Sequence, residues 1–219
     1  RQKDRIAFEN WVYEINIWQA GVDGRVERLI ASTQWDRQPQ FSPDGEQIAF
    51  VSTRSGHSEI WISNAEGSNP TQLTSLAGPH TSQPRWSPDG RRLVFVSRPE
   101  GQADLYVVDA SGAPPRRLTT HPLDEMAPSW SADGRWIYFG TRRSGSWEVW
   151  KVASERGEAQ QVTSNGGYAA FESPDGASVY YVKSDVPGIW KTPLEGGQET
   201  LLLEGPRPEG WGSWAATSA

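Results

Sequence analysis

Phe41-Ser42-Pro43-Asp44-Gly45 decides the fold, because close copies of this stretch return three times along the chain. The copies are Trp86-Ser87-Pro88-Asp89-Gly90, Trp130-Ser131-Ala132-Asp133-Gly134 and Glu172-Ser173-Pro174-Asp175-Gly176. In this motif proline fixes φ, aspartate can bond to its own backbone, and glycine accepts the positive φ that leads into a strand. The motif therefore predicts a tight turn between two strands, repeated with a period of about 43 residues.

The same order of segments follows each turn. An apolar run comes first, at residues 47–52, 92–97, 136–141 and 178–183. After a polar loop, a second run carries one aromatic residue, which is Trp61, Tyr106, Trp150 or Trp190. A short last segment ends each unit, at residues 71–74, 116–119, 160–163 and 199–203. Such short runs, rich in β-branched and aromatic residues and bounded by Gly and Pro, indicate strands rather than helices.

A unit of four short antiparallel strands, repeated at this period, is typical of a β-propeller blade. The first 32 residues lack the turn but hold three candidate strands, near 5–8, 14–20 and 26–30. Gly212-Ser213-Trp214-Ala215 fits the missing innermost strand, so we predict an all-β propeller of five blades with one-plus-three closure between the termini. The predicted blades of this single domain are blade 1 (211–219 with 1–32), blade 2 (33–76), blade 3 (77–120), blade 4 (121–165) and blade 5 (166–210). The alternative is a fragment of a longer propeller.

Composition excludes several classes of protein. The chain has 219 residues, no cysteine and a formal net charge of −6. A disulfide scaffold, a thiolate zinc site and a cysteine nucleophile are therefore excluded, and the acidic balance argues against binding to nucleic acid. No run approaches the ~20 apolar residues of a membrane span. We expect a monomer that contacts neither nucleic acid nor membrane.

The complete repeat also resembles a known family. The unit that runs from Gln83-Pro84-Arg85-Trp86 through Leu93-Val94-Phe95-Val96-Ser97 to Arg117-Leu118-Thr119 resembles the TolB-type propellers built from PD-type repeats, which are related to the WD-repeat class. Asn16-Ile17-Trp18 and residues 167–176 are similar to propellers in the sensor half of bacterial CadC-like winged-helix regulators. The resemblance implies a non-catalytic module that binds a protein or peptide, with a location outside the bacterial cytoplasm.

The topology of such a propeller sorts the loops onto two faces. The connections that enter the innermost strands, and those between the second and third strands, share one face, here called the top face; the Ser-Pro-Asp-Gly turns lie on the opposite face, the turn face. Loops on a rigid scaffold commonly carry binding residues, and Trp, Tyr and Arg dominate binding hot spots. The predicted ligand-binding residues at the top-face mouth of the ring are Trp35, Arg37, His80, Tyr168, Glu172 and Trp211.

Glu172 departs from the repeat, because it stands where Phe41, Trp86, Trp130 and Trp214 place an aromatic ring. A carboxylate at that position must find hydrogen-bond donors or shift its pKa upward. Two interpretations follow. Glu172 is either a channel acid for a ligand or cation, or an acceptor that ties neighbouring strands together.

The other candidate residues have structural interpretations beside the functional ones. We expect the third-strand aromatics to pack between blades; they are Trp18, Trp61, Tyr106, Trp150 and Trp190. Four loop cations recur at similar points and are expected to pair with carboxylates or carbonyls as part of the repeat; they are Arg54, Arg98, Arg142 and Lys183. The three histidines, His57, His80 and His121, lack the spacing of a zinc site, so we expect neither metal nor cofactor.

Two further function classes remain as alternatives. A glycosidase needs paired acids ~5 to 10 Å apart, whereas the predicted inner strands supply only Glu172, and no nucleophile elbow of the Gly-x-Ser-x-Gly type is present. We therefore expect no catalysis, although related propellers gate peptidase domains. A carbohydrate-binding propeller would use exposed indole faces, such as those of Trp11, Trp35, Trp147 and Trp211.

Overall fold

The computed structural model describes residues 14–20, 24–78 and 80–205, and in these ranges the chain is all-β with no helix. Blade 2 comprises β3 (Asp36–Phe41), β4 (Gln47–Ser52), β5 (Glu59–Asn64) and β6 (Thr71–Gln72). Blade 3 comprises β7 (Thr81–Trp86), β8 (Arg92–Ser97), β9 (Asp104–Asp109) and β10 (Arg116–Arg117). Blade 4 comprises β11 (Glu125–Trp130), β12 (Trp136–Thr141), β13 (Glu148–Ala153) and β14 (Gln160–Gln161). Blade 5 comprises β15 (Tyr168–Glu172), β16 (Ser178–Val182), β17 (Ile189–Pro193) and β18 (Thr200–Leu203).

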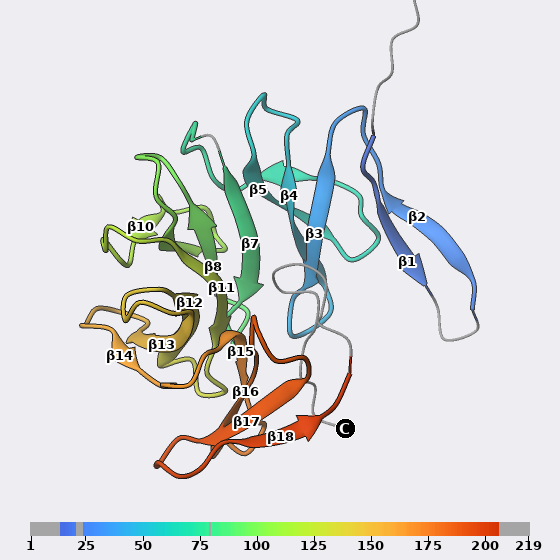
Figure 1. Ribbon diagram of the computed structural model, residues 1–219. Coiled ribbons are helices and arrows are strands. Elements are labelled where there is room, and N and C mark those ends of the chain that lie inside the picture. Colours follow the sequence, from blue (N-terminus) through green and yellow to red (C-terminus); the bar gives the residue numbers. More distant parts are fainter. Residues whose placement is uncertain (1–13, 21–23, 79, 206–219) are drawn as a thin grey trace, which may run out of the picture.

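Each of these four sheets is an antiparallel meander in which consecutive strands pair. Figure 1 shows the sheets arranged as an arc, with the first strands β3, β7, β11 and β15 toward the middle. The first strands of consecutive sheets lie against one another, as expected for propeller blades. The predicted all-β propeller architecture of four-stranded blades is therefore confirmed.

The described part of blade 1 is a hairpin of β1 (Ile17–Ala20) and β2 (Val26–Ile30), which agrees with two of the three strands predicted there. The strand predicted near 5–8 and the closing strand predicted at 211–215 lie outside the described residues. The one-plus-three closure and the outer limits of blade 1 accordingly stay predictions.

The Ser-Pro-Asp-Gly turns are held by a hydrogen-bond set that every copy repeats. In blade 2 the Ser42 hydroxyl donates to Asp44 Oδ1 at 2.6 Å, and the same carboxylate oxygen accepts the backbone N–H of Glu46 at 3.1 Å. Gly45 has φ 76°, which a side chain would disfavour. These bonds lower the pKa of the turn aspartates, and in blade 4 the Ser131 hydroxyl and then the Arg135 backbone N–H lower the pKa of Asp133 to about 2.

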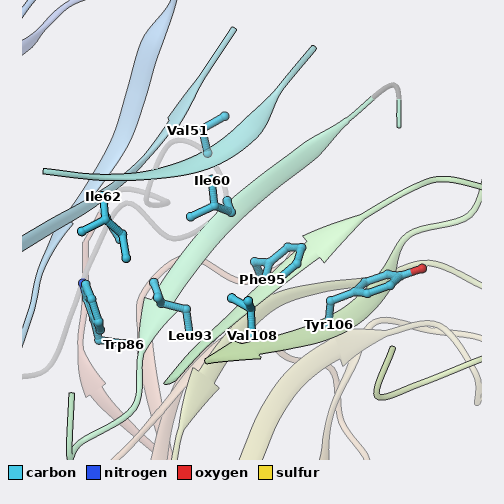
Figure 2. Close-up of a cluster of buried hydrophobic side chains, with 9 residues drawn as sticks. Val51, Ile60, Ile62, Trp86, Leu93, Phe95, Tyr106 and Val108 are labelled. Carbon is cyan, nitrogen blue, oxygen red and sulfur yellow. The ribbon is translucent and has the colours of Figure 1, made fainter. Parts of the chain in front are cut away.

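The hydrophobic core lies between the blades rather than within them. Figure 2 shows one such cluster, in which Ile60 and Ile62 of blade 2 face Trp86, Leu93 and Phe95 of blade 3. Similar clusters join blade 3 to blade 4 and blade 4 to blade 5. Burial of these faces, at about 25 cal/mol per Å² of apolar surface, is the main force that holds the sheets together.

The repeated aromatics seal these interfaces as predicted, with one difference. Trp86 donates its indole N–H to the Gln40 carbonyl at 3.1 Å, and Trp130 donates to the Arg85 carbonyl at 3.0 Å, so each indole bonds to the preceding blade. Tyr106, Trp61, Trp150 and Trp190 pack into or against the apolar clusters between blades. Trp18 on β1 is instead 60% exposed, and its predicted neighbouring strand lies outside the described residues.

Candidate functional site

The predicted top-face residues occupy two positions of the repeat. Counting back from the last residue of each first strand, Arg37 of β3 and Tyr168 of β15 share one position. Trp35 and His80 share the position two residues earlier, immediately before β3 and β7. The repeat thus brings these four side chains to the same end of the innermost strands, contributed by blades 2, 3 and 5.

A β-bulge follows these positions in each of the four described innermost strands. Gln38, Gln83, Ala127 and Ala169 all have φ between 48° and 57°, and the strand register shifts around each of them. The Gln38 side-chain oxygen accepts the Gln83 backbone N–H at 2.8 Å, and Gln83 accepts that of Ala127 in the same way. Bulges commonly re-aim side chains beside functional sites, and this row of bonds fixes the bulges of three blades relative to one another.

Trp35 has a hydrogen-bonded backbone and an exposed side chain. Its N–H donates to Thr53 Oγ1 at 3.1 Å, and its carbonyl accepts the Thr53 N–H at 3.1 Å. A parallel bridge also joins it to Ile15. The residue is nevertheless 44% exposed. Trp35 therefore presents a large apolar surface, and its hydrogen-bonded backbone loses little conformational entropy on binding.

Arg37 and Tyr168 are half-buried beside neighbouring loops, whereas His80 is exposed. The Arg37 guanidinium donates to Ser58 Oγ at 3.4 Å, while its buried Nε has no hydrogen-bond partner in the described part of the chain. Tyr168 lies across Gly140, where an added Cβ would come within 2.9 Å of the Tyr168 Cβ, and its ring centroid is 6.3 Å from that of Trp147. Blade 4 therefore fixes the position of Tyr168.

The structure corrects the placement of Glu172. This residue ends β15, next to the Ser173–Gly176 turn, whereas Tyr168 begins the same strand. Glu172 therefore lies toward the turn face, away from the other predicted site residues. Its Oε2 accepts the Tyr138 hydroxyl at 2.6 Å and its Oε1 accepts the Ala132 N–H at 3.1 Å, so it ties blade 5 to blade 4. Glu172 therefore has the hydrogen-bond donors that the sequence predicted. Its predicted place on the top face is wrong, because the repeat position that it shares with the aromatics is the last residue of the strand, at the turn face.

Two predicted residues fall outside the described part of the chain. These are Trp211, placed at the top-face mouth, and Trp11, named for the carbohydrate alternative. Their contribution to either site stays a prediction.

The loop cations belong largely to the framework. Arg54 pairs with buried Asp36 at 2.9 Å, Lys183 pairs with Glu199 at 2.6 Å, and Arg98 pairs with Asp124 at 3.0 Å. Arg54 also lies over the Trp61 ring and Lys183 over the Trp190 ring, with 5.8 and 4.1 Å to the centroids. Each of these two cations is thus held between a carboxylate and an aromatic face of its own blade.

In blade 4 the framework cation is Arg143 rather than the predicted Arg142. Arg143 lies two residues beyond the end of β12, just as Arg54 lies two beyond the end of β4, and it pairs with buried Glu125 while covering the Trp150 ring at 5.5 Å. Arg142, one residue earlier, instead lies 5.0 Å from the centroid of Trp147. The prediction that Arg142 is the framework cation of blade 4 is therefore wrong by one residue.

Sequence reasoning missed a set of buried carboxylates at the starts of the strands. Glu59 accepts bonds from the Thr74 hydroxyl and from the backbone N–H groups of Leu76 and Ala77, at 2.6, 2.9 and 2.9 Å. Glu148 accepts the Thr163 hydroxyl at 2.6 Å in the same way. The available signal was an acid two residues before the third-strand aromatic, which recurs at Glu59, Asp104 and Glu148.

The innermost strands also begin earlier than predicted and include two more acids, Asp36 and Glu125. Both are fully buried: Asp36 accepts bonds from Ser52 and Arg54, and Glu125 pairs with Arg143. Burial raises the pKa of Glu125, and the nearby Arg143 opposes this shift. Burial likewise raises the pKa of Asp104, opposed by Arg117. The expectation of one carboxylate on the inner strands was therefore wrong, but the added carboxylates are committed to internal partners.

The turn side of the described blades holds a pocket of about 490 Å³, mainly between the inner strands of blades 3, 4 and 5. Arg85, Trp130, Phe171 and Glu172 line it, and burial lowers the pKa of Arg85. Within the described ranges, no three His, Asp or Glu side chains converge as a metal site. Nor does that part of the chain form a helix long and apolar enough to cross a membrane.

Comparison with known families decides the relationship. A family model described as the TolB beta propeller domain matches residues 9–216. The chain belongs to this family. This agrees with the repeat motif and with the four-stranded sheets, and it confirms the TolB-type part of the resemblance seen in the sequence.

Solved structures show the same fold at low sequence identity. A structure assigned to TolB of Agrobacterium tumefaciens superimposes with a TM-score of 0.75 and 23% identity, covering 85% of this chain and 73% of that one. TolB of Acinetobacter baumannii gives 0.70 and 21%, covering 86% and 49%. An oligogalacturonate lyase in complex with manganese gives 0.62 and 18%, covering 77% and 50%.

A curated relative matches a shorter stretch. Tricorn protease homolog 1 of Streptomyces coelicolor is 37% identical over 62 residues, which is 28% of this chain. The matched stretch spans 6% of that relative's own length.

Proposed function

We propose that this domain is a non-catalytic module that binds a protein or peptide segment through its top face. The binding residues are Trp35, Arg37, His80 and Tyr168, with Trp211 as the predicted fifth. The observation that carries the proposal is the alignment of the first four at two repeat positions, at one end of the innermost strands and beside a shared row of bulges. Membership of the TolB family, whose structural relatives include TolB itself, supports the same class of function.

The physical basis is preorganisation of residue types that bind strongly. An exposed indole on a hydrogen-bonded backbone, a tyrosine wedged against blade 4 and a half-buried arginine that donates to Ser58 lie at this end of the strands. Trp, Tyr and Arg are the commonest hot-spot residues, and rigid placement lowers the entropic cost of association. The finer resemblance of residues 16–18 and 167–176 to regulator propellers supports a role as the sensor or interaction part of a larger bacterial protein, located outside the cytoplasm.

Enzymes also occur among proteins of this fold, including the oligogalacturonate lyase and a puromycin hydrolase. The carboxylates of the described inner strands argue against such chemistry here. Asp36 and Glu125 are fully buried with arginine partners, and Glu172 accepts two bonds from blade 4. A general acid or nucleophile must face its substrate, so carboxylates held in these internal bonds are poorly suited to catalysis.

A carbohydrate-binding function is less well supported than peptide binding. Sugar recognition needs an open aromatic face, and Arg142 lies over the Trp147 ring while Tyr168 packs at a tilt of 51° beside it. Trp35 is the exposed indole of this set in the described ranges. One exposed indole of this set fits an apolar peptide side chain better than a stacked sugar ring.

The experiment is a binding screen of short synthetic peptides against the parent chain and two matched variants. Trp35→Ala and Phe41→Ala each remove one exposed aromatic side chain from β3 or its immediate start, but at opposite ends. We expect Trp35→Ala to weaken a peptide hit by about 2 kcal/mol, roughly 30-fold, and Phe41→Ala to leave it unchanged. Loss of binding with Phe41→Ala but not with Trp35→Ala would place the site on the turn face and contradict the proposal.

A further inference from the structure

A groove of about 590 Å³ runs between the outer parts of blades 4 and 5, far along the sheets from the innermost strands. One wall comes from β14 and the connection that follows it, residues 162–165. The other wall comes from β17 and the turn that leads to β18. The volume lies in the range of ligand-binding pockets, ~300–1,000 Å³.

The groove is polar but carries little uncompensated charge. Gln160, Gln161, Asn165 and Gln198 line it with amide groups that can both donate and accept. The carboxylate of Glu199 accepts the Tyr181 hydroxyl at 2.5 Å and the Lys183 ammonium at 2.6 Å, so its charge is already neutralised. The cation among the described lining residues, Lys151, lies over the Trp136 ring, with 4.6 Å from its Nζ to the ring centroid. Such a lining suits uncharged amide and hydroxyl groups rather than phosphate or carboxylate.

The groove wall also contains the open edge of a sheet. β14 pairs with β13 over two residues, Trp150 with Gln161 and Lys151 with Gln160. The N–H of the next residue, Val162, donates inward to the Val149 carbonyl at 2.8 Å. Because antiparallel pairing alternates along a strand, the backbone N–H and C=O of Gln161 point away from β13, at the open edge of the sheet.

Gly196 opens the opposite wall. It has φ 94° in the turn between β17 and β18, and an added Cβ there would meet no atom within 4 Å. The ring of Trp190, which also lines the groove, packs against the apolar cluster between blades 4 and 5 and has the Lys183 ammonium 4.1 Å from its centroid, so it is poorly placed to stack a sugar. A strand edge, amide side chains and no open aromatic face together favour a polypeptide over a carbohydrate.

We propose that this groove binds an extended, uncharged polar peptide segment of a partner protein, which adds as a strand to the outer edge of β14 at Gln161. Backbone hydrogen bonds to the edge supply affinity, and the amide side chains of both walls read alternate side chains of the peptide. This site lies along the outer strands, apart from the top-face residues Trp35, Arg37, His80 and Tyr168, and does not depend on the function proposed for them.

The test uses a proline substitution with a matched control. Gln161→Pro removes the outward N–H while leaving the inward bond of Val162 to β13, a position at which edge strands tolerate proline. Gln72 occupies the same repeat position in blade 2, pairs with Trp61 and donates to the Thr74 carbonyl at 2.7 Å, as Gln161 donates to the Thr163 carbonyl at 2.7 Å. Gln72→Pro thus carries the same backbone change away from the groove.

The probe is an array of synthetic peptides built from Ser, Thr, Asn, Gln and Val, beside acidic and basic arrays and a panel of oligosaccharides. We expect uncharged peptides to bind the parent chain, to protect the Gln161 amide from hydrogen exchange, and to bind Gln161→Pro at least about tenfold more weakly. Gln72→Pro and Trp35→Ala should bind them as the parent does.

A second variant, Gln198→Trp, narrows the groove from an exposed turn and should also weaken binding, which keeps the test valid if Gln161→Pro does not fold. The proposal is overturned if no uncharged peptide binds, if only oligosaccharides or charged peptides bind, or if the groove variants bind as the parent does. Equal losses in Gln161→Pro and Gln72→Pro would also overturn it. Loss of binding with Trp35→Ala alone would assign the peptide to the top face.

Discussion

Replacing Glu172 by leucine removes the acceptor of a hydroxyl group that has little access to water. Tyr138 is 1% exposed and donates to Glu172 Oε2 at 2.6 Å. The second donor, the backbone N–H of exposed Ala132, can bond to water instead. The loss therefore falls on the tyrosine, and a buried donor without a partner costs about 1–3 kcal/mol.

Thermal and urea unfolding measure this loss directly. In a domain of this size, 1 kcal/mol corresponds to about 2–4 °C, so we expect Glu172→Leu to lower Tm by about 2–12 °C. Glu172→Gln keeps an acceptor oxygen and should lose less. Burial first, and then the bond to Glu172, raise the pKa of Tyr138, so the hydroxyl remains a donor and the difference between parent and variant should persist from neutral pH up to about 10, the ordinary tyrosine pKa.

A double-mutant cycle supplies the control. Tyr138→Phe removes the donor, so adding Glu172→Leu to that variant should cost about 1 kcal/mol less than adding it to the parent. The reasoning is refuted if Glu172→Leu has the same Tm as the parent, or if the free-energy losses of the two substitutions simply add in the double variant.

Two further predictions concern backbone and pH. Gly67→Ala should destabilise the chain by more than about 2 kcal/mol, because φ is +74° and the new Cβ would lie 2.2 Å from the Leu29 carbonyl oxygen. In the control Gly56→Ala, φ is +92° but the new Cβ meets no atom within 4 Å, so we expect a loss of only about 1–2 kcal/mol from backbone strain. Equal losses of the two variants in urea unfolding would contradict the clash. Asp133 has its pKa lowered to about 2 by the Ser131 hydroxyl and then the Arg135 backbone N–H, so its stabilising contribution should be present above pH ~4 and disappear as pH falls toward 2. Asp133→Asn should flatten the stability profile in that window, and an unchanged profile would show that the turn bonds do not matter there.

The repeat predicted most of the fold because its turn chemistry is local. Pro, Asp and Gly at fixed spacing specify the turn from a few neighbouring residues, and all four turns form the same hydrogen bonds. The period then places every strand that follows. The blade order and the third-strand packing needed nothing more than this spacing.

The candidate site was less predictable because it depends on which end of a strand a residue occupies and on single-residue register. Glu172 occupies the same repeat position as the buried indoles of Trp86 and Trp130, and that position is the last residue of the innermost strand. The residue types alone did not show that Glu172 and Tyr168 lie at opposite ends of β15. Arg143 rather than Arg142 reaches Glu125, at the same distance from the strand end as Arg54, which pairs with Asp36. The buried acids were missed because their partners come from the following connection, as Thr74 does for Glu59.

The indole bonds between blades also bear on the order in which the blades can fold. Trp86 reaches back 46 residues to Gln40, and Trp130 reaches back 45 residues to Arg85. A ribosome adding about 5–20 residues per second supplies that length in roughly 2–9 s, so each blade can dock on its predecessor as soon as its own first strand emerges. Docking of blades 3 and 4 onto their predecessors then needs no distant sequence. At every stage the growing chain exposes the same type of surface, the outer apolar face of the newest blade, and a chaperone that recognises this one face can protect each intermediate in turn.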